Sequence, residues 1–139
     1  MGDIGSQLPL TVERYFFAHQ EVISNQNHNP DPEVEHSLQN SVDVNINFEE
    51  NEQGVFLGEC TVKTDDEQSI NPRYSYKLTV IGFFRLNEPF PEIEKDKLKE
   101  VCNVLITQLL VGVIRERLNE MTSRGPWGEV VMGFARGCK

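Results

Sequence analysis

The chain has 139 residues, 38% hydrophobic and 25% charged, a composition typical of one soluble domain that can build its own core. Its 13 basic and 22 acidic residues leave a net charge of −9, which argues against a nucleic-acid-binding protein because phosphate recognition needs a basic surface. The same charge disfavours an anionic membrane surface and suits basic partners, although many proteins are acidic simply for solubility.

The cysteine pattern points to a reducing compartment. Cys60, Cys102 and Cys138 are odd in number and show no CxxC spacing, so no disulfide framework is expected. Residues 1–6 carry neither the basic region nor the apolar run of a signal peptide. The longest apolar stretch, 109–114, is too short to cross a bilayer. We therefore expect a cytoplasmic protein without direct membrane insertion.

The first part of the chain is predicted to be rich in strands. A mobile leader, 1–8, precedes a strand over 10–23, where three consecutive aromatic residues (15–17) predict a bulge or apolar groups on both faces. A long polar loop over 25–40 contains two prolines. Strict alternation of apolar and polar residues predicts a strand over 42–48. Two further strands, 55–63 and 74–86, are bounded by polar turns at 49–54 and 64–71.

These four strands have no helix between them, so they are expected to form an antiparallel sheet over 9–86. After a break at 87–91, apolar residues at three- and four-residue steps predict a long helix over 92–123. Gly125 suits the left-handed position past a helix end, and Pro126 prevents continuation. The predicted fold is α+β, with a four-stranded antiparallel sheet packed against one long C-terminal helix in a single domain, 1–139.

The apolar stripe of the predicted helix is wider than contact with one sheet requires. The excess favours a second partner, such as the same helix of another subunit in a homo-oligomer. A helix deeply buried within one domain would show the same pattern. The residues assigned to the subunit interface are Leu105, Leu109, Val113 and Leu118.

A search for reactive chemistry gives no catalytic group, metal site or cofactor. The acidic loop holds His28 and His36 near Asp31, Glu33 and Glu35, but the spacing matches no zinc pattern. Cys102 lies on the apolar stripe, where a free cysteine acts as a small hydrophobe. No GxSxG, P-loop, GxGxxG or HExxH motif is present. We expect a protein that is not an enzyme.

Several large apolar residues lie in segments with proline, glycine or broken alternation. Aromatic residues and methionine on such segments suit adaptable apolar binding. The alternative is ordinary packing of loops onto the sheet. The residues concerned are Phe16, Phe17, Trp127, Val131, Met132 and Phe134.

The sequence IRERLNEMTSRGPW at 114–127 resembles the end of the main helix in the SecB protein-export chaperone family. Members show an apolar stretch, an Arg-Glu pair, and then a Ser-Arg-Gly or Thr-Arg-Gly helix end. The order of the preceding segments is also similar: a long first strand, a long loop, three more strands and then the helix. The resemblance covers most of residues 8–135.

The resemblance implies a sheet backed by helices, dimers formed through the sheet edge, and tetramers formed through the long helices. It also implies that unfolded client polypeptides bind in an apolar groove without ATP. One wall would be the tail at 124–139, through Trp127, Val130, Val131 and Phe134, and the opposite wall would be the crossover after the first strand. Together with the apolar surplus, the expected peptide-binding residues are Phe16, Phe17, Trp127, Val130, Val131, Met132 and Phe134.

Two departures from the family bear on its partners. The family's first-strand signature is replaced by His19-Gln20-Glu21-Val22, and an acidic position of the docking surface for the SecA motor falls near Lys77. Some members hold an aggregation-prone antitoxin instead of serving export. The further partners that the resemblance implies are therefore SecA or an antitoxin.

Two other classes of function remain open. One is an adaptor domain that keeps the fold and holds a single specific partner. The other is a small α+β enzyme, which would require a concave polar site around His19 or Cys102.

Overall fold

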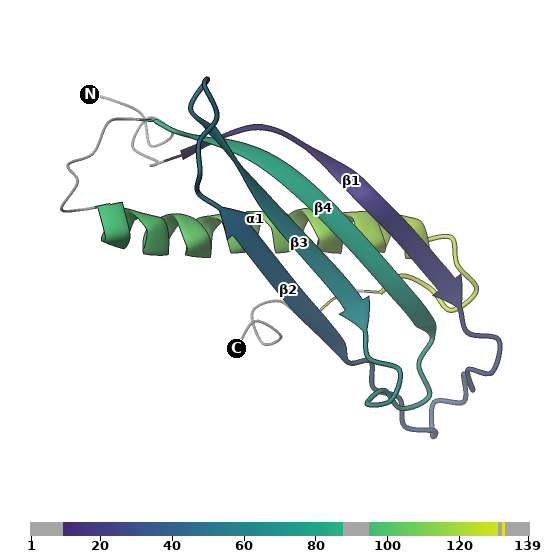
Figure 1. The fold of residues 1–139 in the computed structure, drawn as a ribbon. Helices are drawn as coiled ribbons and strands as arrows, with labels where there is room; N and C mark the ends of the chain where they lie inside the picture. Colours follow the sequence, from purple (N-terminus) through teal and green to yellow (C-terminus); the bar gives the residue numbers. More distant parts are fainter. Residues whose placement is uncertain (1–9, 88–94, 131, 133–139) are drawn as a thin grey trace, which may run out of the picture.

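The computed structural model describes residues 10–87, 95–130 and 132. Its strands form one antiparallel sheet in the order β1-β4-β3-β2, and one helix lies across a face of that sheet (Figure 1). The predicted α+β fold class is confirmed. The predictions for 1–8, 92–94 and 133–139 lie outside the described residues. The elements are β1 (Leu10–Ser24), β2 (Asn40–Asn47), β3 (Val55–Thr64), β4 (Tyr74–Leu86) and α1 (Lys95–Thr122).

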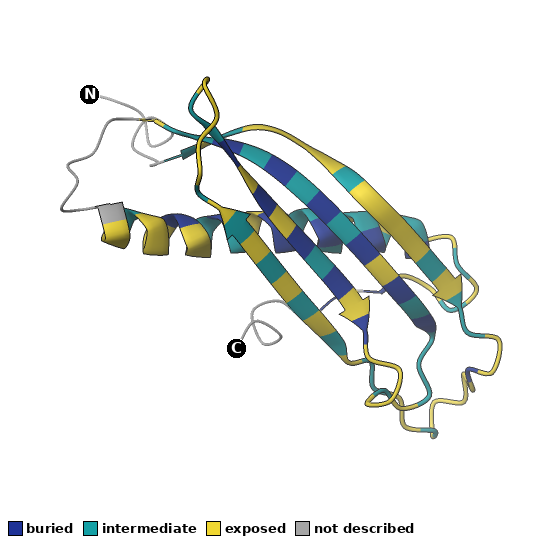
Figure 2. Ribbon diagram, viewed as in Figure 1, coloured by how far each residue is buried: buried dark blue, intermediate teal, exposed yellow. Residues whose placement is uncertain are grey.

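The face of the sheet toward α1, here called the inner face, carries the core. Alternate residues of β3 and β4 point to it, as the period of a strand requires. Figure 2 shows the resulting bands of buried residues on the two central strands, whereas β1 and β2 are more exposed. The largest fully buried side chains of the sheet are Phe56, Val62, Tyr74, Leu78, Val80 and Phe84.

The buried positions of α1 recur every four residues. In a helix of 3.6 residues per turn, a four-residue step advances the position around the axis by about 40°. The buried side therefore winds slowly around the helix, which lets α1 cross the strands obliquely and contact all four of them (Figure 1). This winding widens the apolar stripe within one subunit. This series is Cys102, Ile106, Leu110, Ile114, Leu118 and Thr122, and Val111 is buried beside it.

Two glycines on neighbouring strands make room for the helix. Gly58 and Gly82 are cross-strand partners of β3 and β4. A Cβ at Gly58 would lie 3.1 Å from Ile106 and from Phe84, and one at Gly82 would lie 2.7 Å from Phe84 and 3.3 Å from Leu110. The absence of side chains at this pair allows α1 and the ring of Phe84 to share the inner face.

The first strand carries irregularities where the aromatic residues are consecutive. The β1–β4 register shifts between Val12 and Arg14 and again between Phe17 and His19. Phe16 pairs with Ile81 on the outer face, whereas Phe17 packs against the core from the inner face. The two phenylalanines therefore lie on opposite faces of the sheet.

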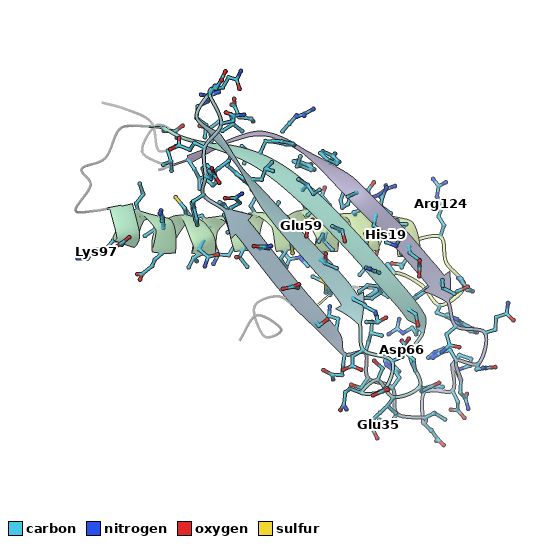
Figure 3. All side chains as sticks on the ribbon, viewed as in Figure 1. His19, Glu35, Glu59, Asp66, Lys97 and Arg124 are labelled. Carbon is cyan, nitrogen blue, oxygen red and sulfur yellow. The ribbon has the colours of Figure 1, made fainter. Side chains whose placement is uncertain are left out.

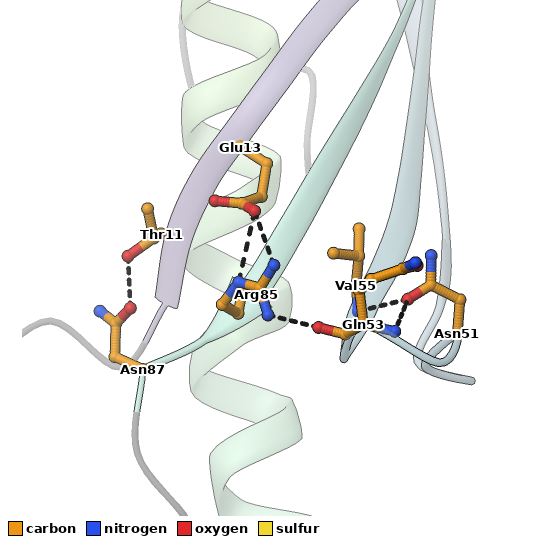
Figure 4. A network of polar contacts seen from close by, with 7 residues as sticks. All are labelled: Thr11, Glu13, Asn51, Gln53, Val55, Arg85 and Asn87. Carbon is orange, nitrogen blue, oxygen red and sulfur yellow. Dashed lines mark hydrogen bonds and ion pairs between the residues drawn. The ribbon is translucent and has the colours of Figure 1, made fainter.

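Polar contacts join the strands at the end of the sheet beside Leu10 and Leu86 (Figure 4). Arg85 on β4 forms an ion pair of 2.8 Å with Glu13 on β1 and also donates to the carbonyl oxygen of Gln53. The side chain of Asn51 accepts from the backbone N–H groups of Gln53 and Val55 at 2.8 and 3.0 Å. The arrangement fixes the β2–β3 turn to the rest of the sheet.

The helix end differs from the sequence prediction at one position. The left-handed backbone (φ 81°) belongs to Gly128 and not to Gly125. Gly125 is required for space, because a Cβ there would lie 2.3 Å from the hydroxyl oxygen of Tyr74. Within the described residues, no helix has the length and apolar character needed to cross a membrane.

Candidate functional site

An open pocket of about 330 Å³ lies at the end of the sheet where β1 ends and β4 begins. Three segments surround it: the crossover loop (25–39) between β1 and β2, residues 71–76 around the start of β4, and the described part of the tail (123–130 and 132) that follows α1. Its lining combines apolar side chains with polar and charged ones. The lining residues are His36, Ser37, Leu38, Asn40, Asn71, Pro72, Arg73, Tyr76, Glu129, Val130 and Met132.

The crossover loop is held in place by hydrogen bonds to the segment before β4. Ser37 and Ile70 exchange two backbone hydrogen bonds of 2.8 Å each. Asn71 has a φ of 47°, a left-handed conformation that asparagine tolerates. Its side chain bonds the backbone N–H and carbonyl of Asn29 at 2.8 and 2.9 Å. His28 Nδ1 donates to the Asn71 carbonyl at 2.9 Å, since a carbonyl oxygen only accepts.

The tail folds back beneath the end of α1. The buried hydroxyl of Thr122 donates to the Leu118 carbonyl and accepts from the Val130 backbone N–H, each at 2.8 Å. These bonds bring the tail against the sheet, and Val130 and Met132 are 9% and 4% exposed. Part of the predicted groove-lining tail therefore forms a wall of the pocket.

Trp127 connects the two walls. Its indole Nε1 donates to the Asn25 carbonyl at 3.0 Å, and its ring lies edge-on to His28 with 4.9 Å between ring centroids. The Trp127 carbonyl accepts from Arg73 Nη1 at 3.2 Å. The side chain is thus engaged within the fold and does not line the pocket.

The remaining predicted peptide-binding residues are divided among different places. Val130 and Met132 line the pocket. Phe16 stacks on Phe83 on the outer face of the sheet, with 6.0 Å between ring centroids, and Phe17 packs against the core from the inner face. Val131 and Phe134 lie outside the described residues.

The pocket also contains polar residues that sequence reasoning missed. Tyr76 is 3% exposed, and its hydroxyl accepts a hydrogen bond of 3.0 Å from Asn40 Nδ2. Burial raises the pKa of Tyr76 to about 12, and the Asn40 hydrogen bond partly opposes that rise. Its phenol is therefore protonated at neutral pH. Arg73 lines the same pocket.

A free strand edge leads away from the pocket. Among the described strands, β2 pairs with β3 alone, and it contains no proline, lysine or bulge. Its inward side chains, Val42, Val44 and Ile46, are half-buried against the core. Just beyond β2, Phe48 lines a second pocket of about 130 Å³ between the sheet and the start of α1. The β2 edge thus runs from one pocket to the other.

No family model and no curated protein matches this chain. Among solved structures it is similar to the Mycobacterium tuberculosis Rv1957 SecB-like chaperone in complex with a ChAD peptide from the Rv1956 HigA1 antitoxin. That likeness has a TM-score of 0.60 and 12% identity, and it covers 90% of each chain. A protein of unknown function from Streptococcus agalactiae is also similar, with a TM-score of 0.44, 14% identity and coverage of 90% of this chain and 97% of that one. The chain has a SecB-like fold.

In this SecB-like fold, the residues predicted for a subunit interface differ in exposure. Leu109 is 38% exposed, Leu105 and Val113 are partly buried, and Leu118 is fully buried in the core of its own subunit. Two residues outside the prediction are more exposed, namely Val101 at 50% and Val104 at 56%. A Cβ at Gly112 would meet no atom within 4 Å. The described part of α1 therefore leaves an apolar face uncovered.

The residues considered for enzyme chemistry lie apart in the SecB-like fold. His19 lies on the outer face of the sheet, as Glu59 does (Figure 3). Its Nε2 is 3.4 Å from Glu21 Oε1. Cys102 is fully buried between α1 and the inner face, and burial raises the pKa of its thiol. In 10–87, 95–130 and 132, no three His, Cys, Asp or Glu side chains gather closely enough to hold a metal ion.

Proposed function

We propose that this protein is an ATP-independent chaperone that holds an extended polypeptide segment in the pocket and along the β2 edge. The observation that carries the proposal is the position of an open pocket at the end of a regular, free strand edge. An extended segment can add to such an edge through main-chain hydrogen bonds, while its alternate side chains enter pockets. The SecB-like fold supports this reading.

The binding mode follows from the geometry of β2. Every second side chain of an added strand would point to the inner side, next to Val42, Val44 and Ile46. The pocket beside Asn40 and the smaller one beside Phe48 would then receive side chains near the two ends of an eight-residue contact. Main-chain bonding would make the site tolerant of sequence, and the pockets would add selectivity.

A dedicated chaperone of an antitoxin is the second candidate and the one favoured over protein export. The similar Mycobacterium tuberculosis chaperone was solved with a peptide from an antitoxin. Docking to SecA is less well supported, because the position where the family carries an acid falls near Lys77, which pairs with Lys63 on β3 and with Glu21 on β1. A single-partner adaptor would use the same pocket with one client.

We further propose that the protein works in the cytoplasm as a single SecB-like domain that forms a homo-oligomer through α1. The exposed Val101, Val104 and Leu109 support a helix-to-helix contact, because apolar residues on one helix face favour burial against a partner. In the SecB family the long helices likewise join dimers into tetramers.

Aggregation of a refolding client protein, measured by light scattering, tests the chaperone activity. Stoichiometric wild-type protein should suppress the scattering without ATP, and Leu38→Asp in the pocket should abolish the effect. Leu57→Asp is the matched control, because Leu57 is 42% exposed on the outer face. Equal scattering with and without wild-type protein would refute the general holdase, and binding of one antitoxin peptide alone would favour the dedicated chaperone.

A further inference from the structure

Two tyrosines of β4 use their hydroxyl groups differently. The Tyr74 hydroxyl donates to the Gly128 carbonyl at 2.8 Å and accepts from the Trp127 backbone N–H at 3.1 Å. The Tyr76 hydroxyl accepts from Asn40 Nδ2 at 3.0 Å, and within the described chain its proton has no acceptor. A phenol carries one donor, so the Tyr76 O–H is unused within the described residues.

The backbone of Tyr76 is tied to the neighbouring strand by Thr64. Its backbone N–H donates to Thr64 Oγ1 at 3.1 Å, and the Thr64 hydroxyl donates back to the Tyr76 carbonyl at 3.4 Å. Both residues are buried, and Tyr76 lines the pocket. The sheet therefore holds the backbone and Asn40 contacts the hydroxyl, so a bound side chain would meet a phenol that is already in place.

Arg73 supplies further donors at the same pocket. A guanidinium group has five N–H donors, and here Nη1 donates to the Trp127 carbonyl. Arg73 forms no ion pair with any residue in the described ranges. Glu129 also lines the pocket, but it is exposed, so water screens its charge.

Two neighbouring amide side chains of the pocket, those of Asn71 and Asn40, are already bonded. The Asn71 amide makes two hydrogen bonds to the backbone of Asn29, and the Asn40 amide nitrogen donates to Tyr76. The hydrogen-bonding groups that Tyr76 and Arg73 leave unused within the described residues are therefore donors. An apolar side chain in the pocket would cover these donors without pairing them, which costs binding energy.

We propose that the pocket selects a client side chain that ends in an oxygen acceptor, as glutamate and glutamine do. Its methylene groups would lie against Leu38, Val130 and Met132, and its oxygen would accept hydrogen bonds from the Tyr76 hydroxyl and the Arg73 guanidinium. This inference rests on the proposed peptide-binding function and adds the class of side chain that the pocket takes. A lysine would place a second cation beside Arg73.

Fluorescence anisotropy with four labelled peptides tests the selectivity. Each peptide alternates valine and serine, is long enough to pair with all of β2, and differs only at one residue, which is Glu, Gln, Leu or Lys. The Glu and Gln peptides should bind about tenfold more tightly than the Leu peptide, and the Lys peptide should bind most weakly.

Variants identify the donors. Tyr76→Phe should remove most of the preference of Gln over Leu, and Arg73→Gln should weaken the Glu peptide more than the Gln peptide. Tyr74→Phe is the matched control, because it removes the same hydroxyl from a tyrosine that does not line the pocket. It should weaken all four peptides to a similar degree.

The outcomes separate this inference from the proposed function. If the Leu peptide binds as tightly as the Gln peptide and Tyr76→Phe changes nothing, the acceptor preference is wrong while peptide binding stands. If none of the four peptides binds to folded wild-type protein, both proposals are wrong. Far-UV circular dichroism of each variant checks that it is folded before affinities are compared.

Discussion

The indole Nε1 of Trp127 donates a hydrogen bond to the backbone carbonyl of Asn25, 102 positions earlier in the chain. This bond fastens the crossover loop to the tail and so sets the separation of the two pocket walls. His28 extends the contact, because its ring lies edge-on to the indole and its Nδ1 bonds Asn71. The pocket is therefore shaped by a side chain that does not line it.

Replacement of Trp127 by phenylalanine should destabilise the protein. The change removes the indole donor and leaves the Asn25 carbonyl without its partner, which should lower the free energy of unfolding by about 1–3 kcal/mol. Urea unfolding measures the change, with Phe16→Leu on the outer face as control. A variant that loses peptide affinity at unchanged stability would instead indicate that Trp127 contacts the client directly.

Replacement by alanine should have opposite effects on stability at two glycines, Gly82 on β4 and Gly112 on α1. Gly82→Ala places a Cβ 2.7 Å from Phe84 in the core and should lower stability by about 1–3 kcal/mol. Gly112→Ala is the matched control on α1, where a Cβ meets nothing within 4 Å. It should raise stability by about 1 kcal/mol, because alanine favours a helix. Equal urea midpoints for the two variants would contradict the close approach of α1 to the sheet.

The strands and the helix could be predicted because the spacing of apolar residues that defines each element lies within its own segment of the sequence. The sequence predicts strands over 42–48 and 74–86 and a helix over 92–123, and the structure has β2 at Asn40–Asn47, β4 at Tyr74–Leu86 and α1 at Lys95–Thr122. Sequence could not show that buried positions of α1 recur every four residues against a crossing sheet. That winding is one reason why Leu118, predicted for an interface, belongs to the core of its own subunit.

The pocket was predictable only in part. The tail and the crossover loop were expected as its walls through the family resemblance, and Val130 and Met132 do line it. The donors of Tyr76 and Arg73 could not be found from sequence, because their availability depends on which groups Asn40 and Trp127 bond after the chain folds. No local pattern distinguishes Tyr76 from Tyr74.

The two neighbouring phenylalanines of β1 should respond differently to truncation. Phe17→Ala removes a side chain that packs against the core and should lower the free energy of unfolding by about 2–3 kcal/mol. Phe16 is 44% exposed on the outer face, so Phe16→Ala should cost about 1 kcal/mol or less. Chemical denaturation of both variants measures the two losses in the free energy of unfolding. A larger loss at Phe16 would mean that the register of β1 against β4 is wrong.

Stability should fall at high pH because of Tyr76. Its pKa is raised from 10.0 to about 12 in the folded protein, so the unfolded chain loses this proton first as pH rises. The contribution is complete below pH 10 and is lost between about pH 10 and 12, with a magnitude on the order of 2 kcal/mol. Tyr76→Phe should remove this part of the fall in stability with pH, and absorbance titration of the folded protein should show a late ionisation that is missing in Tyr76→Phe.

The uncovered face of α1 predicts how the subunits associate. Val104 is 56% exposed near Val101, so Val104→Glu would place a charge within a helix-to-helix contact and should dissociate the oligomer. Gln68→Glu adds the same charge in the turn before β4 and should leave the assembly intact. Sedimentation equilibrium gives the masses. A wild-type monomer, or a Val104→Glu protein of unchanged oligomeric mass, would show that this face is not where the subunits meet.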